Sequence, residues 1–526
     1  MMNFKSDKLC VQPDPLCENK GAEKNKEVLL SVRELCVKVR ESENQKMLLD
    51  NLSFSLRRGE VLALVGETGS GKTMTAKAIM GMLNANLSVE GRIVLEGQNL
   101  LDLNAQEMHA LRGRKIGMAF QNPETALNPL LKNGNQLNLI MGKNESDQVR
   151  RLRLFGLCDK RILKQYPFEL SGGMAQRFMA SLSLGHGVEM VIFDEPTRGL
   201  DPDNRNLLAE LILLLSKKRH VAILLLTHDM GLIERVADRC IVLQDGKIVE
   251  HGSVDTILHH PTSSYMKGIR DEDPRFQRIL PLLDSEEKKQ EETPILELRD
   301  IHCSYALNPF SKERHQVLHE LNMSVFQGEI LGLIGASGCG KSTLASCILG
   351  LLNYQGEILF SGKLLKMRGR PQIGHICQSA TSSFDPARTI RQSLEEVFLV
   401  HPEYALPGEK ENQIHHVLKV VDLYHLLARL DSYPHEFSGG QLQRFAIART
   451  LLSQVKFIIL DEVTSMLDLK TQASIIRLLA RLRKERGLTY IFITHDLPLA
   501  QQFCDRILQM KDGCVRNCLE WEETVC

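Results

Sequence analysis

Two stretches of the chain carry the residue types and the spacing of a phosphate-binding loop. The first is Gly66-Glu67-Thr68-Gly69-Ser70-Gly71-Lys72-Thr73, and the second is Gly335-Ala336-Ser337-Gly338-Cys339-Gly340-Lys341-Ser342. In such a loop the glycines turn backbone N–H groups toward phosphate oxygens, the lysine reaches the β- and γ-phosphates, and the final hydroxyl ligates Mg²⁺. Each loop follows an apolar run and precedes a helical pattern, so two chance matches are not credible.

Polar side chains that suit phosphate chemistry stand at the ends of apolar runs. Each run that ends in an aspartate is followed directly by a glutamate, and other runs end in a glutamine or a histidine. A strand-end aspartate can hold Mg²⁺, the glutamate can polarise an attacking water, and the amide and imidazole can contact the metal, the water or the γ-phosphate. The set is Asp194, Glu195, Gln121 and His228, and again Asp461, Glu462, Gln378 and His495.

These landmarks recur in one order, which indicates a tandem duplication of one α/β domain. A length of 526 residues also requires more than one core. We expect a disordered tail over residues 1–26, a first domain over 27–270, a charged and proline-containing linker over 271–293, and a second domain over 294–526.

Apolar periodicity predicts the elements that position these residues. Strands are expected at 28–39, 51–56, 61–65, 116–120, 190–193, 221–226 and 330–334, and a hairpin over 241–249 turns at Asp245-Gly246. Helices are expected at about 72–83, 171–184 and 203–216, with a mostly helical region up to Tyr166.

Composition favours an ordinary soluble globular protein. The chain is 43% hydrophobic and 25% charged, and Lys+Arg and Asp+Glu both total 65, so no net field draws it to nucleic acid. The 13 cysteines are scattered without zinc-site spacing, which predicts unpaired thiols in a reducing compartment. No signal peptide or membrane span is evident, so we expect a cytoplasmic chain, in which any membrane role needs partner proteins.

Two further motifs lie between each phosphate loop and its Asp-Glu strand. They are Leu170-Ser171-Gly172-Gly173-Met174 and Phe437-Ser438-Gly439-Gly440-Gln441. With them the chain resembles the ATP-binding-cassette family from about residue 28 to 515. The resemblance implies two tandem phosphate-loop domains, each with a mostly parallel core sheet, an antiparallel subdomain and a helical subdomain. It also implies that the domains close head-to-tail on ATP and Mg²⁺ as a pseudo-dimer. A helix start with unpaired N–H groups and no bulky side chains suits capping of a γ-phosphate.

The resemblance implies two composite ATP sites, both hydrolytic. One site joins the first phosphate loop, Gln121, Asp194, Glu195 and His228 to the second signature, Ser438-Gly439-Gly440. The other joins its loop, Gln378, Asp461, Glu462 and His495 to Ser171-Gly172-Gly173. Magnesium would be held by Thr73, Gln121 and Asp194, and by Ser342, Gln378 and Asp461. Asp201 and Asp468 match the family's aspartates that communicate across the closed interface.

Three positions depart from the family pattern. Tyr305 fits the aromatic residue that stacks on adenine in the second copy, but Val39 stands there in the first. Val463 replaces the proline that commonly follows the glutamate, and Met174 replaces the signature glutamine. Neither of the last two changes removes a catalytic group, whereas the first ATP site should hold adenine more weakly.

Local strings resemble the importers of di- and oligopeptides and of nickel. Two of these strings precede the signatures: Tyr166-Pro167-Phe168-Glu169 and Tyr433-Pro434-His435-Glu436. A third string, Gln121-Asn122-Pro123, also resembles this subfamily. The resemblance implies a peripheral ATPase on the cytoplasmic face of the inner membrane, with two permease subunits and an extracytoplasmic solute-binding protein. Nickel, a metal chelate and a peptide all remain open as solutes, since the partners select the solute. We interpret His259-His260 and His415-His416 as solvated surface histidines.

A soluble tandem-cassette ATPase switch, similar to the translation factors of this class, is the alternative. Those factors carry a long charged inter-domain helix, whereas the expected linker here is short and contains Pro274 and Pro281. A DNA-maintenance ATPase would need zinc pairs or coiled-coil insertions, which the sequence lacks.

Overall fold

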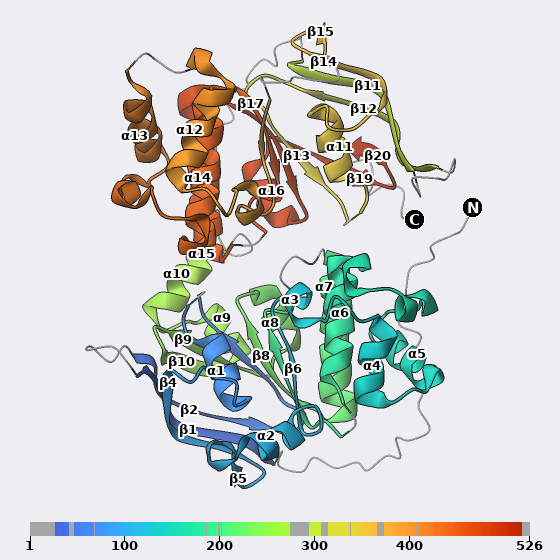
Figure 1. Cartoon of the computed structure of the whole chain (residues 1–526), viewed down its shortest axis with the longest axis vertical. Helices are drawn as coiled ribbons and strands as arrows, with labels where there is room; N and C mark the ends of the chain where they lie inside the picture. The colour runs from blue at the N-terminus through green and yellow to red at the C-terminus, as the bar shows by residue number, and fades with distance from the viewer. Residues whose placement is uncertain are drawn as a thin grey trace. The chain divides into compact units, whose positions relative to one another are not determined.

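The computed structural model describes residues 27–40, 47–67, 69–185, 187–197, 200, 202–273, 294–306, 314–336, 338–365, 373–404, 408–465 and 467–517. The chain divides into two compact α/β units, Met1–Gly268 and Ile269–Cys526 (Figure 1). The predicted tail and residues 274–293 of the predicted linker lie outside the described residues. Helix α10 (Ser264–Glu272) continues two residues into the segment expected to be linker. The domain boundaries drawn from the sequence stay predictions.

The core of the first unit is a six-stranded sheet in the order β10-β9-β3-β8-β7-β6. Its neighbours pair in parallel, except for the antiparallel pair β9 and β10. Strands β3, β7 and β8 are buried along their whole length, as expected for apolar runs covered on both faces. The bounds are β3 (Val61–Val65), β6 (Ile116–Ala119), β7 (Met190–Asp194), β8 (Ala222–Thr227), β9 (Arg239–Gln244) and β10 (Lys247–Ser253).

A second, antiparallel sheet and a helical layer complete the first unit. The sheet order is β2-β1-β4-β5, from β1 (Val28–Val39), β2 (Met47–Arg57), β4 (Leu87–Leu95) and β5 (Gln98–Asn99). Helices α4 and α5 pack beside the long helix α6 (Figure 1). The helices are α1 (Lys72–Ile79), α2 (Ala105–Leu111), α3 (Pro123–Ala126), α4 (Asn133–Met141), α5 (Glu145–Leu154), α6 (Gly172–Ser183), α7 (Pro202–Leu213), α8 (Met230–Val236) and α9 (Val254–His259).

The second unit repeats this plan. Its core sheet has the order β16-β17-β18-β13-β19-β20, and its antiparallel sheet has the order β12-β11-β14-β15. The strands are β11 (Leu296–Ala306), β12 (Arg314–Val325), β13 (Ile330–Ile334), β14 (Gln355–Phe360), β15 (Lys363–Leu364), β16 (Ile373–Ile376), β17 (Phe457–Asp461), β18 (Thr489–Thr494), β19 (Arg506–Lys511) and β20 (Cys514–Asn517). The helices are α11 (Lys341–Ile348), α12 (Ile390–Val400), α13 (Lys410–Val420), α14 (Gly439–Leu452), α15 (Leu469–Arg486) and α16 (Leu497–Phe503).

The fold class and the element types expected from the sequence are confirmed, and the differences lie at the ends of elements: the strand expected at 51–56 is β2, Met47–Arg57. The helix expected to reach residue 83 ends at Ile79, because the chain turns at Gly81 with φ of 59°. The helix expected over 203–216 ends at Leu213 and continues as a π-helical turn over Leu214–Lys218. The hairpin turns at Asp245-Gly246 as predicted, with positive φ at both residues.

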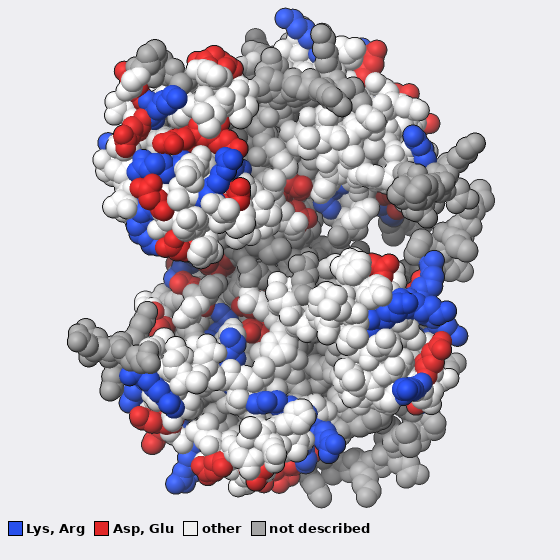
Figure 2. Space-filling view, viewed as in Figure 1, with Lys and Arg blue, Asp and Glu red and all other residues white. Residues whose placement is uncertain are grey.

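The state of the cysteines and the distribution of surface charge agree with the expectations from the sequence. The described cysteines are free thiols: Cys36, Cys158, Cys240, Cys303, Cys339, Cys347, Cys377, Cys504 and Cys514. Within the described ranges, no helix is both long enough and apolar enough to cross a bilayer. Acidic and basic side chains are interspersed on the visible face of both units (Figure 2), which agrees with their equal totals.

Candidate functional site

The first phosphate loop joins the end of β3 to the start of α1. Gly71 caps the helix with φ of 108°, and a Cβ there would lie 2.5 Å from Cδ2 of Leu49. Gly69 also has a positive φ, of 89°. Both positions therefore need glycine, which leaves the N–H groups of the loop and of the helix start free of side-chain cover. Thr68 and Ser337, predicted members of the two loops, lie outside the described residues.

Lys72 extends along its loop and is buried. Its Nζ donates to the backbone oxygens of Gly66 at 2.5 Å and Glu67 at 3.0 Å, and lies 3.5 Å from Glu195 Oε1. In the second unit Lys341 Nζ donates to the oxygens of Gly335 and Ala336, at 2.8 Å each. Each ammonium is thus held inside the curve of its loop, where it can meet phosphate oxygens.

A hydroxyl and a carboxylate lie together beside each lysine. Thr73 Oγ1 donates to Asp194 Oδ1 at 3.3 Å, and the nearby Ser342 hydroxyl opposes the rise in the pKa of Asp461. Burial raises the pKa of Asp194 to about 6, the neighbouring Glu195 adds to the rise, and the Thr73 hydroxyl opposes it. Burial likewise raises the pKa of Asp461. Hard oxygen ligands crowded beside a phosphate loop fit Mg²⁺, whose charge would relieve this unfavourable ionisation.

The glutamate of the first unit is held by a histidine. His228 Nδ1 lies 2.9 Å from Glu195 Oε2, and the N–H of Glu195 donates to the oxygen of Leu226 at 2.8 Å. Burial alone would raise the pKa of Glu195, but the His228 hydrogen bond and the charges of His228 and Lys72 outweigh it and lower the pKa. The carboxylate is therefore ionised at neutral pH and oriented at the carboxyl edge of the sheet.

The glutamate of the second unit has a different principal partner. Gln378 Nε2 donates to Glu462 Oε2 at 2.7 Å, while His495 Nδ1 lies 3.5 Å from Glu462 Oε1. Both glutamates have φ of 47°, a strained value for a residue with a side chain. Gln121 follows β6 as predicted and is half-buried, but among the described residues no hydrogen bond joins its side chain to Glu195.

The two signatures form the starts of α6 and α14. Ser171 caps α6 by accepting from the N–H of Met174 at 3.3 Å, and Ser438 caps α14 through a reciprocal box with Gln441. Met174 has no side-chain acceptor with which to close the corresponding box in the first unit. A Cβ on Gly173 would lie 2.9 Å from Asn204, and one on Gly440 would lie 2.5 Å from Cγ2 of Thr471. These glycines keep each signature close to the helix that follows its Asp-Glu strand.

The structure therefore brings together most of the predicted site residues within each unit. The gathered sets are Lys72, Thr73, Asp194, Glu195 and His228 in the first, and Lys341, Ser342, Gln378, Asp461, Glu462 and His495 in the second. The joining of one unit's signature to the other unit's phosphate loop stays a prediction. Asp201 lies outside the described residues, whereas Asp468 caps α15 through the N–H and hydroxyl of Thr471.

Tyr305 ends β11 with its ring 40% exposed, as a base-stacking residue requires. Its hydroxyl lies 3.1 Å from Thr343 Oγ1, one residue after Ser342 on α11. This contact ties the ring to the helix that follows the phosphate loop. The counterpart Val39, at the end of β1, is half-buried and offers no aromatic face.

Sequence reasoning missed two hydroxyls that position site residues. Ser465 Oγ donates to the backbone oxygen of Glu462 at 3.0 Å and lies 3.5 Å from Gln378 Nε2. Thr343 is the partner of Tyr305 described above. A hydroxyl three residues after a strand-end glutamate was the available signal for Ser465, since that spacing allows a side-chain bond back to the backbone.

The adjacent histidine pairs lie apart from these centres. His259, His260 and His416 are exposed, and His415 is half-buried 3.9 Å from Glu411. No cluster of three or more His, Cys, Asp or Glu side chains that could hold a metal ion exists among the described residues. The interpretation of these pairs as surface histidines is confirmed for the three exposed members.

Comparison with known proteins gives the same assignment for both units. The ABC transporter family matches residues 49–198 and 318–465. The glutathione import ATP-binding protein GsiA of Escherichia coli O1:K1 is 34% identical over 534 aligned residues, covering 92% of this chain and 85% of the relative. The GsiA protein of Escherichia coli K12 matches with the same identity and coverage.

Among solved structures, an archaeal ribosome recycling factor, aABCE1, matches 92% of this chain and 90% of its own chain, with a TM-score of 0.59 and 21% identity. The RNase-L inhibitor matches with a TM-score of 0.59 and 20% identity, over 92% of this chain and 91% of its own. At these identities the two structures establish the fold alone. The duplicated site, the two family matches and the full-length relatives together show that the chain is an ATPase and belongs to the ABC transporter family.

Proposed function

We propose that this chain hydrolyses ATP to drive a membrane importer of small peptides. The observation that carries the proposal is the duplicated cluster of phosphate-loop lysine, strand-end aspartate and oriented glutamate. A single cluster would fit many ATPases, whereas two in one chain fit an ATPase that closes on two ATP molecules, and the relatives decide between a transporter and a soluble switch. The full-length relatives named as glutathione import ATP-binding proteins support the importer and point to a peptide as solute.

Each residue of the cluster has a defined task in the proposed reaction. Lys72 and Lys341 bind the β- and γ-phosphates, and Glu195 and Glu462 accept a proton from the attacking water. His228 orients Glu195, while Gln378 orients Glu462, at the distances given above. Thr73 with Asp194, and Ser342 with Asp461, would hold Mg²⁺, which would supply positive charge against the transferred phosphate.

We infer that each ATP is shared between the units. The helix starts at Ser171 and Ser438 present N–H groups next to glycines that leave room for a phosphate. Closure on two ATP molecules would couple binding to a rigid-body motion, and hydrolysis would reopen the pair. The loops that follow Gln121 and Gln378 are proposed to carry this motion to two permease subunits on the cytoplasmic face of the inner membrane.

The surface after Gln121 supports such a docking role. Leu130 and Leu139 are 84% and 80% exposed on the segment that leads into α4 and on α4 itself. At the matching place in the second unit, Arg388 pairs with Glu396 and Arg391 pairs with Asp431 and Glu411, and both signs of charge gather there (Figure 2). The end of α12 also exposes Leu399 and Val400, at 72% and 65%, so both permease subunits would meet apolar side chains, flanked by ion pairs in the second unit. An extracytoplasmic binding protein would deliver the solute.

Uptake by cells that lack this gene tests the proposal. The cells are offered labelled glutathione, a labelled dipeptide and labelled nickel side by side, and are complemented with wild type or with the Glu195→Gln/Glu462→Gln variant. Loss of peptide uptake, restored by wild type alone, is the expected result. Loss of nickel uptake alone would move the solute to a metal and contradict the peptide assignment. No change for any solute would contradict the importer and favour the soluble switch.

A further inference from the structure

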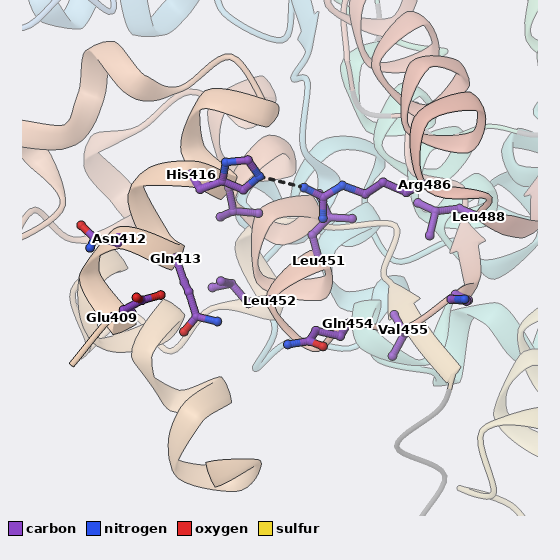
Figure 3. Close-up of a pocket in the computed structure, with 12 residues that line it drawn as sticks. Glu409, Asn412, Gln413, His416, Leu451, Leu452, Gln454, Val455, Arg486 and Leu488 are labelled. Atoms are coloured by element: carbon purple, nitrogen blue, oxygen red, sulfur yellow. Dashed lines mark hydrogen bonds between the residues drawn. The ribbon is translucent and has the colours of Figure 1, made fainter. Parts of the chain in front are cut away.

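A hollow of about 510 Å³ lies in the second unit, at the sheet edge opposite the phosphate loop (Figure 3). Helix α13 and the ends of α14 and α15 surround it, together with the residues that lead into β17 and β18. Lys456 directly precedes β17, whose far end carries Asp461. The hollow is thus separated from the ATP site by the length of these strands.

Positive charge dominates the lining of this hollow. Lys456 and Arg486 line it, and Glu409 is the single acid among its described lining residues. Arg486 Nη2 lies 3.5 Å from His416 Nε2 (Figure 3), and no carboxylate among the described residues pairs with the guanidinium. Within the described residues Lys456 forms no ion pair. A second hollow of about 340 Å³ shares Gln454, Val455 and Lys456 and has no acid in its described lining.

The first unit neutralises the matching region. Glu189 directly precedes β7, as Lys456 directly precedes β17, and pairs with both Arg58 and Lys115. Glu96, which follows β4, pairs with the same two cations, whereas Ser361 follows β14. The second unit therefore has Lys456 where the first has Glu189, and the neutral Ser361 where the first has Glu96.

The first unit also fills its hollow with a side chain. Arg151 on α5 donates to the backbone oxygens of Ser181, at 3.3 Å, and of Leu184 at the end of α6. Arg151 is half-buried, and this burial, with the nearby charge of Arg219, lowers the pKa of Arg151 to about 10. In the second unit the shorter His416 on α13 contacts Arg486 instead, and the space stays open.

We propose that the hollow of the second unit binds a small oxyanion with two or more negative charges. A guanidinium recognises carboxylate and phosphate groups with paired hydrogen bonds, and a nearby ammonium adds a mobile donor. Gln454 in the lining supplies an amide donor that suits the same oxygens. The volume falls within the usual range for small-ligand sites. A phosphate ester and a polycarboxylate share this chemistry, and the site does not depend on which solute is transported.

Thermal unfolding of the full chain tests the site. Citrate and glucose 6-phosphate serve as separate probes, with NaCl added to hold the ionic strength constant. A rise in unfolding temperature with probe concentration gives an apparent Kd. The Lys456→Gln/Arg486→Gln variant should raise that Kd about tenfold or more, since two charged donors are lost. The Lys484→Gln/Lys363→Gln variant removes two exposed lysines outside the lining and should leave it unchanged.

The response to each probe assigns the ligand class. A response to citrate alone indicates a polycarboxylate, a response to glucose 6-phosphate alone indicates a phosphate ester, and a response to both supports the shared chemistry. A saturating non-hydrolysable ATP analogue with Mg²⁺ should leave the response intact, because the two sites are separate. If the double variant does not fold, Lys456→Glu, which restores the acid of the first unit, takes its place and should also abolish the response.

Three results would overturn the proposal. They are a wild-type response equal to that of NaCl, equal losses in the lining and control variants, and displacement of the probe by the ATP analogue.

Discussion

The two candidate ATP sites have the same residue types but hold their glutamates differently. Glu195 has a 9% exposed side chain, with His228 at 2.9 Å and Lys72 at 3.5 Å. Glu462 has a 17% exposed side chain and accepts from Gln378 at 2.7 Å, with His495 at 3.5 Å. A matching list of residues therefore does not give matching centres, because the hydrogen bond that orients the base comes from a histidine in one and an amide in the other.

Removal of both bases should have the largest effect. Glu195→Gln/Glu462→Gln keeps the shape of both side chains but accepts no proton, so hydrolysis should fall by about 10²–10⁴-fold while ATP binding persists. Phosphate release and nucleotide binding, measured on the same preparation, check this. Each single variant shows how much turnover the other centre retains. Normal turnover in the double variant would refute the assigned bases.

Removal of the side chains that orient each glutamate should show whether the two sites differ. In a chain with Glu195→Gln, Gln378→Ala should slow the remaining centre about tenfold or more, because Glu462 loses its shortest hydrogen bond. In a chain with Glu462→Gln, Gln121→Ala should cost less than His228→Ala, since His228 holds Glu195. Single-turnover rates at saturating ATP measure both. Equal losses for the two glutamines would remove the proposed difference between the centres.

The raised pKa of Asp194 predicts a pH effect with a defined sign. A folded-state pKa of about 6 exceeds the unfolded value of 3.8, so the folded chain keeps this proton longer than the unfolded chain. The free energy of unfolding should therefore fall as pH rises from about 4 to 6 and stay lower above that range.

Asp194→Asn tests this sign. Without nucleotide or Mg²⁺ at pH 7.5, the variant should be more stable than wild type by as much as about 3 kcal/mol. Chemical denaturation at pH 4 and pH 7.5 measures the difference, which should shrink at the lower pH. A variant that is less stable than wild type at pH 7.5 would contradict the cost assigned to the buried charge.

The smallest effect should come from the helix caps. Met174→Gln supplies the acceptor that would close a reciprocal box with Ser171, as Gln441 does with Ser438. We expect about 0.5–1 kcal/mol of added stability for the first unit, and a similar loss from Gln441→Met in the second. Denaturant unfolding of the full chain measures both. Equal and opposite shifts support the difference in capping, whereas no shift in either variant would argue against it.

Sequence patterns predicted the elements and the membership of the centres, but not their internal contacts. Apolar runs ending in Asp194 or Asp461 are strong signals, because a strand buried on both faces has few alternatives. The partner of Glu462 depends on side-chain rotamers that no local pattern encodes, so the Gln378 contact was visible only in the structure.

The difference in charge between matching positions of the two units was equally hard to detect from the sequence. Glu189 and Lys456 occupy matching places before β7 and β17, but each reads in the sequence as an ordinary polar residue before a strand. Their difference acquires meaning only from Arg58 and Lys115, which are distant in sequence from Glu189 and contact it through the fold.

The contacts that Glu195 and Glu462 make without nucleotide also affect when each carboxylate can reach a water molecule. Lys72, which is expected to bind the incoming phosphates, lies beside Glu195. Gln378, an expected metal ligand, donates a hydrogen bond to Glu462. Phosphate oxygens that bind Lys72 would draw its ammonium away from Glu195 and leave that carboxylate to a water molecule, whereas Gln378 would keep Glu462 oriented. In the first unit the base would therefore become available only once nucleotide is bound.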